Sequence, residues 1–236
     1  AYSEGTWDQA QHQLGSNATY LTANDNKDLG STAATLQGKE SQIDVYAPVV
    51  LASKEGIAYM GDNKGIVNAK GASTTAVNNG AIIGFARNGG TVNIDGTAVA
   101  KDANVTNNTL KYHNIAGLAT LDTTALPGAT TGGTVDITGA VDVYGMGGLA
   151  SGTGSVVNLN NINNTIRTGS SGALAAVNGG KVNFAGGTIT HAENVAGDHD
   201  SSSPIYADST SGIHFTGGTT INMSHGILMP GTASDY

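Results

Sequence analysis

Short strands, each marked by a Val-polar-hydrophobic triplet between glycines, recur along the chain. The copies read KGIVNAKG at 64–71, GGTVNIDG at 89–96, GGTVDITG at 132–139, GSVVNLNN at 154–161, GGKVNFAGG at 179–187 and SGIHFTGG at 211–218. Alternation with a period of two is the signature of a β-strand whose two faces meet different surroundings. Each copy therefore predicts one short strand with two side chains in the core and one side chain outside.

The copies return at intervals that suit one coil of a solenoid. Their first apolar positions are Val67, Val92, Val135, Val157, Val182 and Ile213. The intervals are 25, 43, 22, 25 and 31 residues, and repeats of about 20–45 residues are typical of solenoids. The 43-residue interval is interpreted as two units, with a weak unit around 112–117 between them. A second apolar segment precedes most copies, at 57–60, 82–85, 148–150, 173–177 and 204–207.

These patterns predict an all-β chain, folded as a right-handed parallel β-helix of about ten coils. Glycine, and asparagine in pairs such as Asn178 and Gly179, suits the positive φ values that sharp corners need. Scattered glycine and β-branched residues disfavour helices, and an antiparallel sandwich is the alternative fold. Residues 1–42, which hold Trp7, fit the repeat badly and are expected to cap the stack or form irregular first coils. Residues 43–236 are expected to hold the repeats, with loop insertions near 122–134 and 192–203.

The middle residues of the triplets form the predicted binding surface. In stacked coils like positions stack, so the outward residues are expected to form one polar stripe of Asn93, Asp136, Asn158, Asn183 and His214. Amide and carboxylate groups on a flat surface hydrogen-bond sugars or a partner strand. The alternative is that an asparagine ladder only stabilises the stacking.

A second candidate is the acidic segment AENVAGDHDSSS at 192–203, which is expected to project from the coils. It holds Glu193, Asp198, His199 and Asp200, and the carboxylate oxygens of its three acids suit calcium. It lacks both the EF-hand spacing and the glycine–aspartate nonapeptide of calcium-binding repeats. The interpretation is therefore a solvated acidic loop, and calcium binding is left open.

Composition and charge narrow the function classes. The net charge is −8 and arginine occurs only at Arg87 and Arg167, so neither nucleic acid nor a direct anionic-membrane contact is predicted. The chain has no cysteine, which removes disulfides. It has no apolar run of 18 residues, and no cofactor motif is recognised.

The residues predict no catalytic or metal site. There is no G-D-S-G motif, and the six histidines are scattered. Glycoside hydrolysis needs two carboxylates at a fixed separation, whereas the polar stripe holds only Asp136. A groove that joins several acids to Arg87 or Arg167 would favour a polysaccharide-degrading enzyme. The lone Thr-x-Thr at 188–190 is too little for ice binding.

Three stretches resemble the passenger repeats of classical, monomeric type V autotransporter adhesins: ALAAVNGGKVNFAGGTIT at 173–190, GIAYMGDNKGIVNAKGAS at 56–73 and GGTVNIDGT at 89–97. The resemblance covers most of 56–223. It implies an extracellular virulence factor on the surface of a Gram-negative bacterium. Its partners would be a host glycan, a host surface protein or a neighbouring passenger.

The same resemblance implies that this chain is a trimmed passenger fragment. The family's signal peptide and C-terminal outer-membrane barrel are not within it, and membrane attachment would run only through that barrel. The expectation is a non-catalytic adhesin or aggregation factor. A polysaccharide-degrading enzyme and a purely structural stalk are the alternatives.

Overall fold

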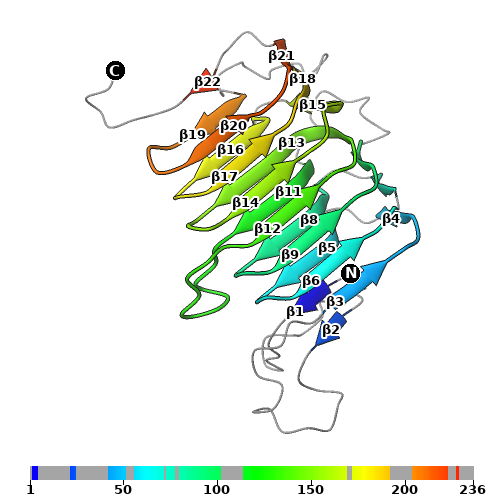
Figure 1. Cartoon of the computed structure of the whole chain (residues 1–236), viewed down its shortest axis with the longest axis vertical. Helices are drawn as coiled ribbons and strands as arrows, with labels where there is room; N and C mark the ends of the chain where they lie inside the picture. Colours follow the sequence, from blue (N-terminus) through cyan, green and yellow to red (C-terminus); the bar gives the residue numbers. More distant parts are fainter. Residues whose placement is uncertain are drawn as a thin grey trace, which may run out of the picture.

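The computed structural model describes residues 2–4, 22–24, 42–51, 56–71, 73–77, 80–101, 114–168, 172–191, 204–222 and 227–228. In these residues every regular element is a strand, and every strand pair is parallel. The alternative of an antiparallel sandwich is therefore wrong for this part of the chain. The strands stack as rungs along the long axis of the molecule (Figure 1).

The rungs form three faces. Face B is a seven-stranded sheet of β3 (Gln42–Val45), β6 (Ile66–Ala69), β9 (Thr91–Ile94), β12 (Thr134–Ile137), β14 (Val156–Leu159), β17 (Lys181–Phe184) and β20 (Gly212–Phe215). Faces A and C are the two arms of a fifteen-stranded sheet and share β13 (Val141–Ser151). Face A also holds β2 (Thr22–Asn24), β1 (Tyr2–Glu4), β5 (Ile57–Asp62), β8 (Ile82–Arg87), β11 (Asn114–Thr120), β16 (Leu174–Val177), β19 (Ile205–Ala207) and β22 (Ile227–Leu228). Face C also holds β4 (Val49–Leu51), β7 (Thr74–Ala76), β10 (Ala98–Ala100), β15 (Asn164–Thr168), β18 (Gly187–His191) and β21 (Thr219–Asn222).

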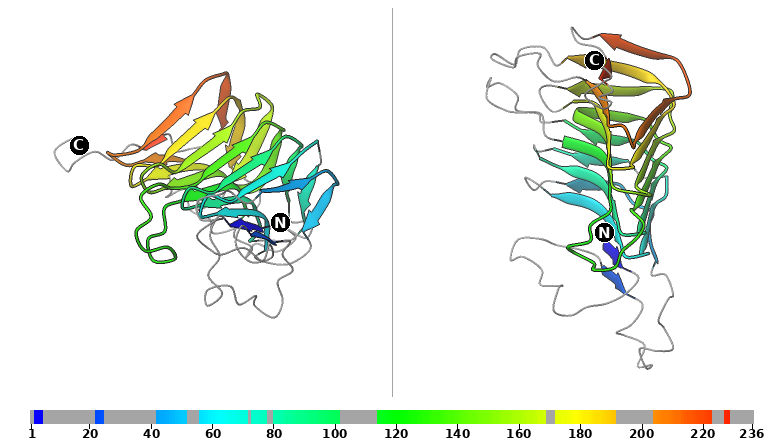
Figure 2. Two further views of the ribbon diagram at one scale, coloured as in Figure 1. Left: turned by 60° about the horizontal axis from the view of Figure 1, so that its bottom comes forward. Right: turned by 90° about the vertical axis from the view of Figure 1, so that its left-hand side faces the viewer.

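The chain visits faces A, B and C in turn and comes back one rung further on. Thus β5, β6 and β7 pair with β8, β9 and β10, respectively. The strand β13 runs through two faces: residues 142–144 pair with β15 on face C, and residues 148–151 pair with β16 on face A. This arrangement, seen from two further sides in Figure 2, is consistent with a parallel β-helix.

The interpretation of the 43-residue interval as two coils is wrong. Val92 of β9 lies directly opposite Val135 of β12, so no rung fits between these two strands on face B. One coil holds the whole interval, and residues 114–117 of the predicted weak unit are part of its face A strand, β11. Part of its extra length lies in the loop 121–133.

The core is the space enclosed by the three faces. The predicted inward pairs of β9, β12, β14 and β17 are fully buried, which confirms that part of the alternation: Val92 and Ile94, Val135 and Ile137, Val157 and Leu159, and Val182 and Phe184. Face C contributes small inward residues in its early rungs, such as Ala98 and Ala100, and larger ones further on, such as Ile166 and Ile189. These short Ala- and Thr-rich strands, the third strand of each coil, were not predicted because they lack a strong apolar alternation.

The corner between faces A and B is a tight turn that needs positive φ. In three coils an asparagine begins this left-handed pair, with φ of 48° at Asn63, 53° at Asn88 and 55° at Asn178. Gly89 and Gly179 follow two of them at 82° and 88°. Asparagine and glycine tolerate this region better than other residues. The prediction of a corner at Asn178 and Gly179 is confirmed.

Candidate functional site

A row of polar side chains runs along the outside of face B, with one residue from each strand. In register from β3 to β20 the positions are Asp44, Asn68, Asn93, Asp136, Asn158, Asn183 and His214. We call these seven residues the polar row. Parallel pairing spaces them about 4.8 Å apart. The five residues of the predicted stripe therefore occupy consecutive rungs.

Hydrogen bonds divide the polar row into two runs. In the first run Asn93 Nδ2 donates to Asn68 Oδ1 at 2.7 Å, and Asn68 Nδ2 donates to Asp44 Oδ1 at 2.7 Å. In the second run, Asn183 Nδ2 donates to Asn158 Oδ1 at 2.6 Å, and Asn158 Nδ2 donates to Asp136 Oδ1. Every bond points toward the earlier coil, and each run ends on an aspartate.

The aspartates dictate this direction. An ionised carboxylate only accepts, so the next asparagine must turn its Nδ2 toward it and its Oδ1 away. The same orientation then passes to the following asparagine. Asn93 and Asp136 are neighbours in register and lie where the two runs meet.

The polar row begins at Asp44. Neither Asp44 nor Asn68 was included in the polar stripe predicted from the sequence. Hydrogen bonds from Asn68 and then Lys70 hold the pKa of the Asp44 carboxyl below its ordinary value. Lys70 Nζ lies 3.1 Å from Asp44 Oδ2 and 5.5 Å from the ring centroid of Tyr46, which is 71% exposed. The signal was present in the triplets IDV at 43–45 and VNA at 67–69, which share the spacing of the other copies.

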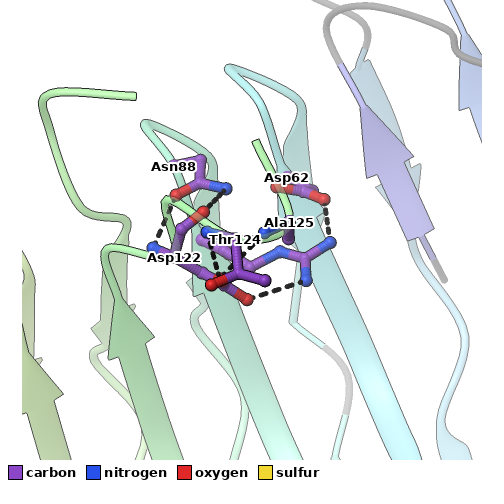
Figure 3. A network of polar contacts seen from close by, with 6 residues as sticks. Asp62, Asn88, Asp122, Thr124 and Ala125 are labelled. Atoms are coloured by element: carbon purple, nitrogen blue, oxygen red, sulfur yellow. Dashed lines mark hydrogen bonds and ion pairs between the residues drawn. The ribbon is translucent and has the colours of Figure 1, made fainter. Parts of the chain in front are cut away.

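A second polar cluster lies at the corner between faces A and B (Figure 3). Arg87 pairs through Nη2 with Asp62, which is only 4% exposed, and through Nη1 with Asp122 Oδ2 at 3.4 Å. The Asn88 side chain brackets the backbone of Asp122, donating to its carbonyl at 3.1 Å and accepting from its N–H at 2.8 Å. These bonds hold the start of the loop 121–133 against two earlier coils.

This cluster joins two acids to Arg87, the combination that would favour an enzyme. However, the backbone N–H groups of Ala125 and Thr124 donate to Asp122 Oδ1 at 2.9 and 3.0 Å. The Ala125 bond first, then the Thr124 bond and the Arg87 charge, hold the pKa of the Asp122 carboxyl below its ordinary value. A general acid at neutral pH needs a raised pKa. The geometry instead matches an ion-pair cluster that holds successive coils together.

The other arginine lies on face C. Arg167 Nη1 pairs with Asp142 Oδ1 at 2.5 Å, and Lys101 Nζ pairs with the other oxygen of the same carboxylate. The Arg167 guanidinium also lies 5.1 Å from the ring centroid of Tyr144. Three successive coils are therefore linked by one ion-pair group on the outside of this face.

Part of the predicted site falls outside the described residues: Glu193, Asp198, His199 and Asp200. Among the described residues, no group of three or more His, Asp or Glu side chains is placed to hold a metal ion. The same part of the chain has no helix long and apolar enough to cross a membrane.

Comparisons with protein-family models, with curated proteins and with solved structures found no match to this chain.

Proposed function

We propose that the chain is a non-catalytic passenger segment of an autotransporter-like adhesin, displayed on or secreted from a Gram-negative bacterium. In this proposal it mediates adhesion to host cells or aggregation of neighbouring cells. The observation that carries the proposal is the polar row, which extends over seven successive rungs of face B. A regular row of amides and carboxylates offers multiple hydrogen bonds to a glycan or to a protein surface, each weak alone and effective together.

The finer description of the fold belongs to the same proposal. A right-handed coil is proposed because about 98% of parallel strand-to-strand crossovers are right-handed. The expected count of about ten coils exceeds the seven rungs of face B and stays a prediction. A solenoid of this kind is a stiff rod, which suits the display of a binding surface away from a cell.

The alternative of a polysaccharide-degrading enzyme has less support from the carboxyl groups. Hydrogen bonds lower the pKa of Asp44, Asp122 and Asp208. Retaining and inverting glycosidases both need one carboxyl with a raised pKa. A purely structural stalk is the third alternative, and a binding assay separates it from an adhesin.

The test uses the whole chain displayed on a non-adherent bacterium and on beads. We expect adhesion to epithelial cells or to glycans on an array, or clustering of the beads. The double variant Asp136→Ala/Asn158→Ala, at the start of the second run, is expected to lower the binding at least about tenfold. The matched control is Thr165→Ala/Thr188→Ala, two outward polar residues on consecutive rungs of face C. It is expected to leave the binding unchanged.

Three results would contradict the proposal. If the wild-type chain neither adheres nor clusters, the stalk is favoured. If the chain turns over polygalacturonate or a host glycan, the enzyme is favoured. Equal losses in the face B and face C variants would show that binding does not depend on the polar row.

A further inference from the structure

The outside of face A carries an apolar row where face B carries its polar row. From β5 to β19 the in-register outward residues are Met60, Phe85, Leu118, Leu149, Ala175 and Tyr206. Each of these side chains is partly exposed, whereas their neighbours along the strands point into the core. The apolar segments predicted strands here, but their outward residues were not identified from the sequence.

A second row lies beside the first, made of the partly exposed Ile57, Ile82 and Ile115, with the buried Met146 next in register. We call the two rows together the apolar face. It contains no charged residue in a chain whose net charge is −8. At its border toward face B, the guanidinium of Arg87 lies 6.0 Å from the ring centroid of Phe85.

The apolar face is not a requirement of the fold. Leu149 and Asn158 come from the same coil and both point outward, one on face A and the other on face B. Face B shows that polar residues are accepted at such a position. Contiguous apolar patches beyond a few hundred Å² mark interaction surfaces on soluble proteins.

We propose that a second copy of this chain docks on the apolar face, face A against face A. This inference goes beyond the proposed function, which rests on the polar row, and assigns self-association to a second surface. Six rungs spaced about 4.8 Å apart, with strands of three to seven residues on this face at about 3.3 Å per residue, give roughly 500 Å² per copy. A pair therefore buries about 1,000 Å², the lower limit for a specific protein contact, which predicts weak and reversible association.

Two features of the apolar face favour a second copy over other occupants. Sheets pack face to face at about 10 Å, and this face is itself the outer surface of a sheet. A two-fold axis that runs the two solenoids antiparallel sets Leu118 opposite Leu149, and the large Phe85 opposite the small Ala175. Such an isologous contact needs only one self-complementary surface.

Charge argues against a lipid surface as the occupant. A chain of net charge −8 is repelled by an anionic bilayer. Two copies also repel each other through their net charges, but the repulsion falls as salt screens it, while the apolar contact persists. Self-association is therefore expected to strengthen between low and physiological ionic strength.

The test compares Leu149→Lys with Val156→Lys by sedimentation velocity over a range of concentrations. Both residues are apolar, outward-facing and partly exposed in one coil, but Val156 lies on face B. In a two-fold symmetric contact the Leu149 side chain of each copy lies in the interface, so one substitution changes two contacts. Leu149→Lys is therefore expected to weaken the dimer at least about a hundredfold. Val156→Lys is expected to keep the wild-type dissociation constant.

A neutral variant, Leu149→Gln, keeps the charge constant and is expected to weaken the dimer at least about tenfold. Thermal unfolding of each variant establishes that it is folded. A wild-type chain that stays monomeric at all concentrations would overturn the inference, as would equal weakening by Leu149→Lys and Val156→Lys. Binding to phosphatidylcholine vesicles, with or without phosphatidylglycerol, by a monomeric chain would assign the apolar face to lipid instead.

The two proposals fail separately. If Leu149→Lys abolishes self-association while adhesion to cells is unchanged, the apolar face and the polar row have different roles. If the wild-type chain dimerises through Leu149 in solution but neither adheres nor clusters beads, the proposed function fails and the dimer surface stands.

Discussion

Gly117 makes the packing between faces A and B testable by the addition of one methyl group. It lies on β11 in register with Gly84 and Gly148, so three successive rungs of face A have glycine where the valines of face B approach. A Cβ on Gly117 would lie 2.8 Å from Val157 Cγ1 and 3.3 Å from Val135 Cγ1. Both valines are completely buried, and β-branched side chains are stiff about χ1.

The expected cost of Gly117→Ala follows from this overlap. Overpacking of a filled core costs about 1–3 kcal/mol, and we expect about 2 kcal/mol here. For a chain of this size, that lowers the midpoint of thermal unfolding by about 4–8 °C. Val157→Ala alone leaves a cavity and costs about 2 kcal/mol. In the double variant the new methyl group occupies that cavity, so the two costs are expected to fall short of additivity by about 1 kcal/mol.

Urea unfolding of the four proteins in this cycle measures the coupling. The control is Gly218→Ala, because a Cβ on Gly218 meets no atom within 4 Å. It is expected to leave the free energy of unfolding within about 0.5 kcal/mol of the wild type. A stability loss in Gly117→Ala no larger than that of the control would refute the tight approach of the two faces. Strictly additive costs in the double variant would refute the assignment of the clash to Val157.

Three further predictions address buried and surface polar groups. Replacing Arg87 by Met leaves the buried Asp62 carboxylate without its charged partner and is expected to cost about 3 kcal/mol in urea unfolding; an unchanged midpoint would contradict the pairing. The pKa of Asp208 lies well below its ordinary value of 3.8. The first cause is the backbone N–H of Asn178, in the preceding coil, which donates to the carboxylate. Its contribution is therefore present above pH 4 and lost as the pH falls below the ordinary pKa, so Asp208→Asn is expected to flatten the decline of the thermal midpoint in acid. Replacing Tyr59 by Phe removes the 2.7 Å hydrogen bond to the buried Thr74 hydroxyl and is expected to cost about 1–2 kcal/mol, measured by thermal unfolding.

Local patterns predicted the individual strands of face B well. In β9 the residues Val92 and Ile94 are buried, while Asn93 between them is outside, as the period of two requires. Strand alternation depends on neighbours in the chain, so it is visible in a window of four residues. The first coil was harder to recognise from the sequence. Asp44 was omitted from the predicted stripe because its triplet lacks flanking glycines.

The polar clusters were not visible in the sequence. Asp62, Arg87 and Asp122 come from three coils, and the loop that carries Asp122 has no counterpart elsewhere in the repeat. Their meeting depends on how the corners stack. The same holds for Lys101, Asp142 and Arg167 on face C, whose strands were not predicted.

The sequence by itself determined the parts that depend on short-range geometry: the alternating strands, and corners such as Asn178 and Gly179 with their positive φ. Only the tertiary structure decided which rung follows which, and therefore which outward residues form a row. Loop closure costs only about 0.6 kcal/mol more for each doubling of length, so a 43-residue coil stacks as readily as one of 25 residues. Spacing alone therefore did not reveal that Val92 pairs directly with Val135. Backbone hydrogen bonds between coils set that register, and with it both the polar row and the apolar face.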